Sequence, residues 1–148
     1  MTSYKHTQIS YLILGVLCAV LIFFIWLYGV ITTQTSIPAF AIGVMLFVIV
    51  ILASFGTLTV SVDERYVAIK FGCGIFRKRF TIDEVASVAR VKNHWYYGWG
   101  IRVWFWPYMW IYNVSGFNAV ELVMKNKRVY RIGTDVPEEL EAVIKSVL

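Results

Sequence analysis

Charged residues are absent from a long stretch near the start of the chain: no Asp, Glu, Lys or Arg lies between Lys5 and Asp63. Hydrophobic residues make up 59% of the sequence, whereas an ordinary soluble domain has roughly 45–50%. All nine acidic residues and every basic residue except Lys5 occur from Asp63 onward. The chain therefore joins an uncharged apolar part to a charged, net basic part, which excludes a simple soluble domain.

Cysteine and histidine are also scarce, with two of each. Cys18 lies within an apolar run and Cys73 lies between two glycines, so a disulfide framework is not expected. The two histidines are His6 and His94, and with these cysteines they supply no plausible set of zinc ligands. We therefore expect no metal site.

The acidic and glycine-rich motifs do not indicate catalysis. Neighbouring residues on a strand point to opposite faces, so neither Asp63-Glu64 nor Asp83-Glu84 can converge on a substrate. The motifs at 72–74 and 98–100 lack the third glycine and the following helix of a nucleotide-binding loop, and they are typical of turns or bulges. We expect a protein that is not an enzyme and that binds no cofactor.

Two apolar runs predict transmembrane helices over residues 9–31 and 37–58. Each run gives roughly 33 Å of helix at about 1.5 Å per residue, enough to cross a bilayer core of about 30 Å. Pro38 follows Ser36, a pattern typical of a helix start, and the polar linker 32–36 is short enough to predict an antiparallel hairpin. A cleaved signal peptide is the alternative for the first run, but that run exceeds the roughly 7–15 apolar residues of such a peptide.

The basic residues predict the orientation of this hairpin. Lys5 precedes the first run, the linker has no basic residue, and Arg65 and Lys70 follow the second run. Because basic flanks remain in the cytoplasm, the N-terminal segment 1–8 and the domain at 59–148 are both expected there, with the linker 32–36 on the other side of the inner or plasma membrane. Neither helix carries an ionisable side chain, which favours an anchor over a transporter.

After the second run the hydrophobic period changes to two. Val67, Ile69 and Phe71 alternate with residues of the opposite face, a pattern that predicts a strand. Turn residues divide the chain between residues 57 and 132 into seven or eight strands in an antiparallel arrangement. The segments with this pattern are 57–62, 65–71, 75–81, 85–92, 100–106, 110–114, 117–125 and 128–132.

The C-terminal segment predicts one amphipathic helix. Asp135 and Glu138 flank Pro137 in the D-x-x-E form of a capping box. Apolar residues then recur at i, i+3, i+4 and i+7 between Leu140 and Val147. The order of elements favours a bent barrel or orthogonal sandwich that is capped by this helix.

Several segments of the domain carry a family resemblance. They are GWGIR at 98–102, YNVSG at 112–116, AVEL at 119–122, and RIGTD with PEEL at 131–140. These segments resemble the bacterial pleckstrin-homology-like (PH-like) membrane protein family, and the similarity extends over roughly residues 57–148. The resemblance implies a seven-stranded bent barrel capped by a C-terminal helix. The family is largely uncharacterised, so the resemblance informs the fold more than the function.

The densest basic cluster is Arg77-Lys78-Arg79, soon after the second apolar run. A basic residue near an anionic bilayer contributes about 1 kcal/mol of attraction, so these three residues with Lys70 predict a patch for lipid headgroups. Lys70, Arg77 and Arg79 also fit the K-x(n)-R-x-R pattern of phosphoinositide-binding PH hairpins. The alternative is a solvated strand edge that only supplies the positive-inside signal.

Aromatic residues concentrate between His94 and Tyr112. Trp and Tyr favour bilayer interfaces because their rings are apolar while an N–H or O–H still needs a polar partner. We interpret the stretch as a loop or hairpin in the headgroup region. A barrel core or a protein-docking face is the alternative, and stacking on single-stranded nucleic acid is not favoured for a membrane-tethered chain. The tryptophans concerned are Trp95, Trp99, Trp104, Trp106 and Trp110.

These features predict a non-enzymatic membrane protein whose cytoplasmic PH-like domain binds protein partners or anionic lipid headgroups at the membrane surface. The alternative is an accessory or structural subunit of a larger membrane complex, with the aromatic stretch as its docking face. The expected partners are the lipid bilayer, its anionic headgroups, and a membrane protein or a second copy of the chain. Nucleic acid is not an expected partner.

Overall fold

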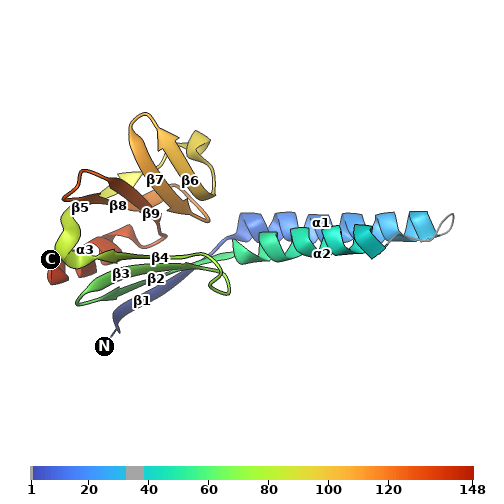
Figure 1. Ribbon diagram of the computed structural model, residues 1–148, viewed down its shortest axis with the longest axis horizontal. Helices are drawn as coiled ribbons and strands as arrows, with labels where there is room; N and C mark the ends of the chain where they lie inside the picture. The colour runs from blue at the N-terminus through green and yellow to red at the C-terminus, as the bar shows by residue number, and fades with distance from the viewer. Residues whose placement is uncertain (1, 33–38) are drawn as a thin grey trace.

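The structure, a computed structural model, describes residues 2–32 and 39–148. Its main body is a β domain of two sheets with a helix, α3 (Pro137–Val147), near one end of the space between them (Figure 1). Two apolar helices, α1 (Tyr11–Thr32) and α2 (Ala39–Ser54), project side by side from the other end. The prediction of a mainly-β domain with a C-terminal helix is confirmed at this level.

The two projecting helices differ in length. α1 is long and apolar enough to cross a membrane between Tyr11 and Ile31. The described part of α2 has 16 residues, fewer than the roughly 20 of a full span. The predicted second run, 37–58, extends too far, because the chain enters a strand at Thr57. The predicted linker 32–36 and Pro38 lie outside the described residues, apart from the end of α1.

A strand that the sequence pattern did not reveal precedes α1. β1 (Thr2–Ile9) pairs antiparallel with β2 (Thr57–Asp63), with Ile9 opposite Thr57 and His6 opposite Val60. Residues 2–8 of the predicted N-terminal segment are therefore part of the β domain. α1 and α2 are inserted between two neighbouring strands, so α1 begins and α2 ends at the same sheet.

The first sheet has the order β1-β2-β3-β4, which places β4 at its edge. Every second residue of β2 and β3 is buried, from Leu58 to Phe71, as the predicted alternation requires. These residues face the second sheet and form most of the core with it. The last two strands of this sheet are β3 (Tyr66–Phe71) and β4 (Arg77–Thr81).

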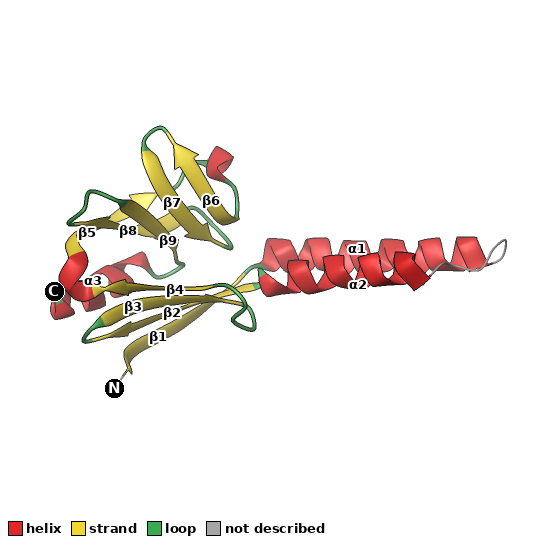
Figure 2. Ribbon diagram, in the orientation of Figure 1, coloured by secondary structure: helices red, strands yellow, loops and turns green. Residues whose placement is uncertain are grey.

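The second sheet has the order β5-β8-β9-β7-β6, and the short helix η1 (Ile82–Glu84) connects it to the first (Figure 2). One pair corrects the antiparallel prediction: β7 and β9 are parallel. After β7 the chain does not form the neighbouring strand but places β8 one position farther along the sheet. β9 then fills the position between β8 and β7. Because β9 is antiparallel to β8, it runs parallel to β7. The strands are β5 (Val85–Lys92), β6 (Gly100–Phe105), β7 (Tyr108–Asn113), β8 (Asn118–Met124) and β9 (Val129–Gly133).

Helix α3 confirms the predicted apolar stripe, since Leu140 and Ile144 are fully buried against the sheets. The predicted capping box is wrong. Val136 is the residue before the helix, and its N–H donates to Thr134 Oγ1 at 3.2 Å. Asp135 does not cap the helix, because its carboxylate contacts His6 on β1.

Candidate functional site

Buried hydrogen bonds fix the helix pair to the β domain. Ser10, immediately before α1, is fully buried, and its N–H donates to the Gly56 carbonyl at 2.8 Å. Its hydroxyl donates to the Val114 carbonyl at 2.5 Å and accepts from the Ile13 N–H at 3.2 Å. Ser10 therefore caps α1 and also joins it to the turn after β7.

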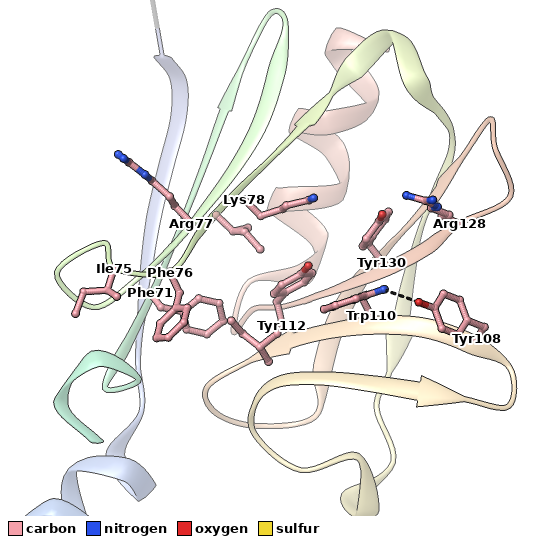
Figure 3. Close-up of a pocket in the computed structure, with 12 residues that line it drawn as sticks. Phe71, Ile75, Phe76, Arg77, Lys78, Tyr108, Trp110, Tyr112, Arg128 and Tyr130 are labelled. Atoms are coloured by element: carbon pink, nitrogen blue, oxygen red, sulfur yellow. Dashed lines mark hydrogen bonds between the residues drawn. The ribbon is translucent and has the colours of Figure 1, made fainter. Parts of the chain in front are cut away.

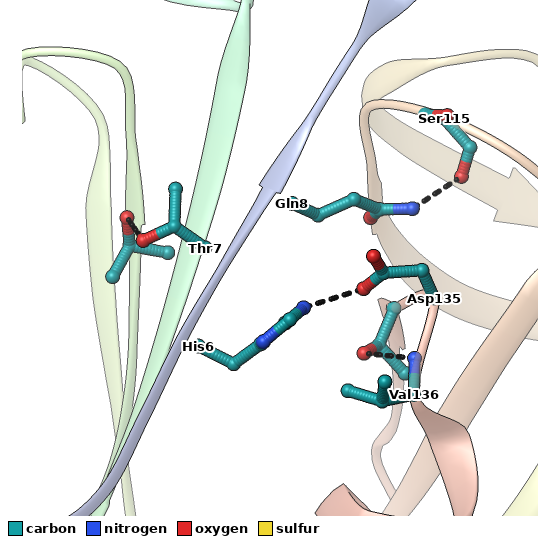
Figure 4. Close-up of polar contacts among 8 residues, drawn as sticks. His6, Thr7, Gln8, Ser115, Asp135 and Val136 are labelled. Atoms are coloured by element: carbon teal, nitrogen blue, oxygen red, sulfur yellow. Dashed lines mark hydrogen bonds and ion pairs between the residues drawn. The ribbon is translucent and has the colours of Figure 1, made fainter.

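Two further contacts from β1 reach the second half of the chain (Figure 4). Gln8 Nε2 donates to the Ser115 carbonyl at 3.1 Å, and His6 Nε2 lies 2.6 Å from Asp135 Oδ1. The positions of α1 and α2 relative to both sheets are thus set by β1.

The loop between β3 and β4 lies against the end of α2. Gly72 has a φ of 47°, and a Cβ there would meet the Ser54 carbonyl oxygen at 2.5 Å, so only glycine allows this approach. Phe76 stacks on Phe55 with 5.3 Å between ring centroids. Ile75 and Phe76 are nevertheless 60% and 41% exposed. An exposed apolar loop therefore lies beside the base of the helix pair.

The predicted basic residues follow this loop but divide between two faces of the first sheet. Lys70 and Arg77 are opposite each other, and Arg79 is opposite Ala68, on the face away from the core. Lys78 is opposite the buried Ile69 and so lies on the inner face. All four basic side chains are exposed, and none forms an ion pair with another described residue.

A pocket of about 590 Å³ lies between the edge of the first sheet and the second sheet (Figure 3). Phe71 and the 75–76 loop line its end next to the helices. Lys78 from β4 and Arg128 from the turn before β9 line it from opposite sides. Arg77 also lines it, with its guanidinium directed away from the other labelled side chains. Among the described residues no Asp or Glu lines the pocket, so its charge is positive.

Tyrosines and one tryptophan form the wall of the pocket on the second sheet. Trp110 Nε1 donates to the Tyr108 hydroxyl oxygen at 3.2 Å. The rings of Tyr112 and Tyr130 are almost fully buried, but their hydroxyls hydrogen-bond to no other described residue and end at the pocket. Burial and the nearby Tyr130 raise the pKa of Tyr112 to about 12, so its hydroxyl stays protonated.

The five predicted tryptophans do not form one surface. Trp110 faces the pocket, whereas Trp104 packs with Tyr97 and the buried Met109 on the other face of the second sheet. Trp99 borders a second pocket, of about 520 Å³, together with Ile13 of α1. Trp110 therefore packs against the main core, Trp104 packs against a separate small cluster, and Trp99 lines a pocket with the helix bases.

The two remaining tryptophans are exposed. Trp95 begins the short helix η2 (Trp95–Tyr97) and is 76% exposed, and Trp106 is 91% exposed. Trp106 lies in the β6–β7 turn, at the end of this hairpin that is farther from α1 and α2 (Figure 1). Phe105 beside it is 76% exposed.

Sequence reasoning identified the basic cluster but missed the pocket. Tyr112 of β7 is far in sequence from Arg128 and Tyr130 around the start of β9, and the parallel pairing of β7 with β9 brings them together. Within the part of the chain that the structure describes, no three His, Cys, Asp or Glu side chains are grouped to hold a metal. Comparisons with protein-family models, curated proteins and solved structures found no match.

Proposed function

We propose that this chain is a membrane protein that is anchored by α1 and α2 and binds anionic lipid headgroups through the first sheet of its β domain. Exposed apolar side chains along both helices support the anchor, for example Ile25 at 71% and Phe40 at 81%. In a bilayer these side chains contact lipid rather than water. The proposal places the domain in the cytoplasm, on the same side as the N-terminus, because β1 pairs with β2.

One observation carries the headgroup assignment: an exposed apolar loop beside the end of α2 leads directly into cations without acidic partners. The anchor holds this loop at the membrane surface, where Ile75 and Phe76 enter the interface. Lys70, Arg77 and Arg79 then lie at the level of the phosphates. Three such residues contribute about 3 kcal/mol at about 1 kcal/mol each, roughly a hundredfold in affinity.

We also propose that the β domain is PH-like. Two sheets that share one core, with a C-terminal helix against them, support this assignment. The nine described strands and the parallel β7–β9 pair depart from a seven-stranded antiparallel barrel. The headgroup proposal does not depend on the family, because it follows from the position and charge of the loop.

The test is lipid retention by the full-length protein. The protein is reconstituted in bilayers of equal phosphatidylglycerol and phosphatidylcholine, extracted in mild detergent, and its retained lipid quantified. The wild type should retain mainly phosphatidylglycerol, and salt should weaken this preference. The variant Lys70→Gln/Arg77→Gln/Arg79→Gln should retain less phosphatidylglycerol than the wild type.

A charge-matched variant provides the control. Lys92, Lys125 and Lys127 are exposed and form no ion pair with a described residue, so their triple change to Gln should leave the preference intact. Equal retention of the two lipids by the wild type would contradict the proposal.

The position of Phe105 and Trp106 favours a second candidate function, that of an accessory subunit in a membrane complex. Both side chains are exposed at a turn that is directed away from the anchor, where a bilayer carrying the helices does not reach them. A protein partner would cover them. Co-purification in mild detergent tests this: a stoichiometric partner should be lost with Phe105→Ser/Trp106→Ser, and its absence from the wild type would count against the role.

A further inference from the structure

The pocket between the sheets is positively charged at one end and apolar at the other. We propose that it binds one anionic amphiphile head first, with the anionic group between Lys78 and Arg128 and the hydrocarbon part passing Phe71 and the 75–76 loop toward the helices. The inference rests on the proposed function only in that the bilayer supplies this ligand at the base of α1 and α2.

The charged end has the donors that a phosphate group needs. Lys78 and Arg128 come from different sheets, both are exposed, and neither forms an ion pair with a described residue. Both side chains are directed toward the space above Tyr112 and Tyr130 (Figure 3). The unpartnered hydroxyls of these tyrosines add two neutral donors. Charge-assisted hydrogen bonds from Lys and Arg suit phosphate oxygens, and the absence of a lining carboxylate removes the main source of repulsion.

The apolar end lies next to the anchor. Phe71 is buried, while Ile75 and Phe76 are partly exposed where the loop meets α2. A small soluble anion would leave this end in contact with water, whereas an acyl chain would cover it. A pocket of about 590 Å³ is within the roughly 300–1,000 Å³ of small-molecule sites, which suits a single ligand.

This site is separate from the outer basic face. Lys70 and Arg79 lie on the opposite side of the first sheet from Lys78, as the β3–β4 register requires. A lipid on the outer face can exchange freely with the bilayer, whereas the pocket holds one molecule between two sheets. The two sites therefore respond to different substitutions.

Native mass spectrometry of the full-length protein in a neutral detergent tests the proposal. The protein is titrated with dioctanoylphosphatidylglycerol, with dioctanoylphosphatidylcholine, and with glycerol phosphate, which has no acyl chains. We expect a one-to-one complex with phosphatidylglycerol and at least tenfold weaker binding of the other two. Lys78→Gln/Arg128→Gln should weaken the complex at least tenfold. The conservative single variant Lys78→Arg, which keeps both positive charges, should bind as the wild type does.

The matched control is Lys125→Gln/Lys127→Gln, which removes two charges from the same turn as Arg128 without touching the pocket. It should leave the one-to-one complex unchanged, as should Lys70→Gln/Arg79→Gln on the outer face. Unchanged affinity in Lys78→Gln/Arg128→Gln would overturn the proposal. Affinity for glycerol phosphate equal to that for phosphatidylglycerol would overturn the role of the acyl chains. Equal affinity for phosphatidylcholine would overturn the role of the net negative charge of the headgroup.

The results also separate this inference from the proposed function. If only the outer-face variant changes lipid retention from the bilayer, and no one-to-one complex forms, the pocket proposal fails alone. If the one-to-one complex forms and the outer-face variant retains as much phosphatidylglycerol from the bilayer as the wild type, the proposed function fails and the pocket stands.

Discussion

The two sheets of the β domain differ in how they relate to the helices. The first sheet is continuous with α1 and α2 through β1 and β2, and its β3–β4 loop is packed against the end of α2. The second sheet is joined to the helix base mainly through hydrogen bonds to Ser10 and Gln8, and it carries the aromatic residues on both of its faces. The first sheet is therefore fixed directly to the helix pair, and the second supplies a wall of the pocket.

Deletion of β1 should have the largest effect on the connection between the first sheet and the helices. A chain that lacks residues 2–9 loses the pairing with β2 and the contacts of His6 and Gln8, so we expect it not to reach the folded state. The same applies to a fragment that starts at Val60, which lacks β1 and half of β2. Limited proteolysis and circular dichroism should show an unfolded β domain. By contrast, Phe105→Ser/Trp106→Ser should fold normally, and a protease-resistant truncated chain would show that β1 is dispensable.

Ser10→Ala weakens the connection between the two sheets and the helix base. The change removes the cap of α1 and leaves the Val114 carbonyl without its partner, at an expected cost of about 2 kcal/mol. Urea unfolding in detergent should show a lower midpoint with an unchanged slope. Thr7→Ala, which removes only an exposed hydroxyl pair with Thr59, is the control and should change little.

Ionisation of Tyr112 should lower the stability of the domain at high pH. Its pKa in the folded state is about 12, against 10.0 for an unperturbed tyrosine, because burial and Tyr130 disfavour the charged form. The unfolded chain loses this proton first, so the contribution is fully present below pH 10 and is lost as the pH rises from 10 through 12. At pH 11 the wild type should therefore lose roughly 1 kcal/mol more than Tyr112→Phe, relative to pH 9. Equal losses in urea unfolding would contradict the burial of this hydroxyl.

The contact between His6 and Asp135 should have the smallest effect. The pair is partly exposed, with 29% and 55% of the two side chains accessible, so solvent screens it. We expect His6→Gln to cost less than about 1 kcal/mol. A double-mutant cycle with Asp135→Asn measures the coupling, and a value well above this would show that β1 is held more by this pair than by its strand register.

The strands of the domain could largely be predicted because burial on one face imposes a period of two, as in β2 and β3. β1 could not, since its sequence is largely polar and its partner Thr59 lies 52 residues from Thr7, beyond both helices. The parallel β7–β9 pair depends on which strand fills the gap beside β7, a choice that alternation does not encode.

The residues of the candidate site likewise divide into those that a local sequence pattern predicts and those that only the assembled sheets bring together. Adjacent residues such as Arg77 and Lys78 are visible as a cluster in the sequence, but only the register separates the outer face from the pocket. Tyr112, Tyr130 and Arg128 carry no local signal, because each is an ordinary strand or turn residue until the sheets are assembled. Likewise, Asp135 has the spacing of a helix cap, but the tertiary contact with His6 replaces it.

The most direct test compares the two ends of the β domain in one bilayer. In the full-length protein with Cys18→Ser/Cys73→Ser, a nitroxide label is attached through Ile75→Cys or through Trp106→Cys and its accessibility to oxygen and to a water-soluble nickel complex is measured in phosphatidylglycerol-containing nanodiscs. The label at position 75 should be accessible to oxygen and protected from nickel, as in lipid, and the label at position 106 should show the reverse. A label at position 75 that is as accessible to nickel as the one at 106 would contradict the proposed function, because the loop would then not contact the membrane.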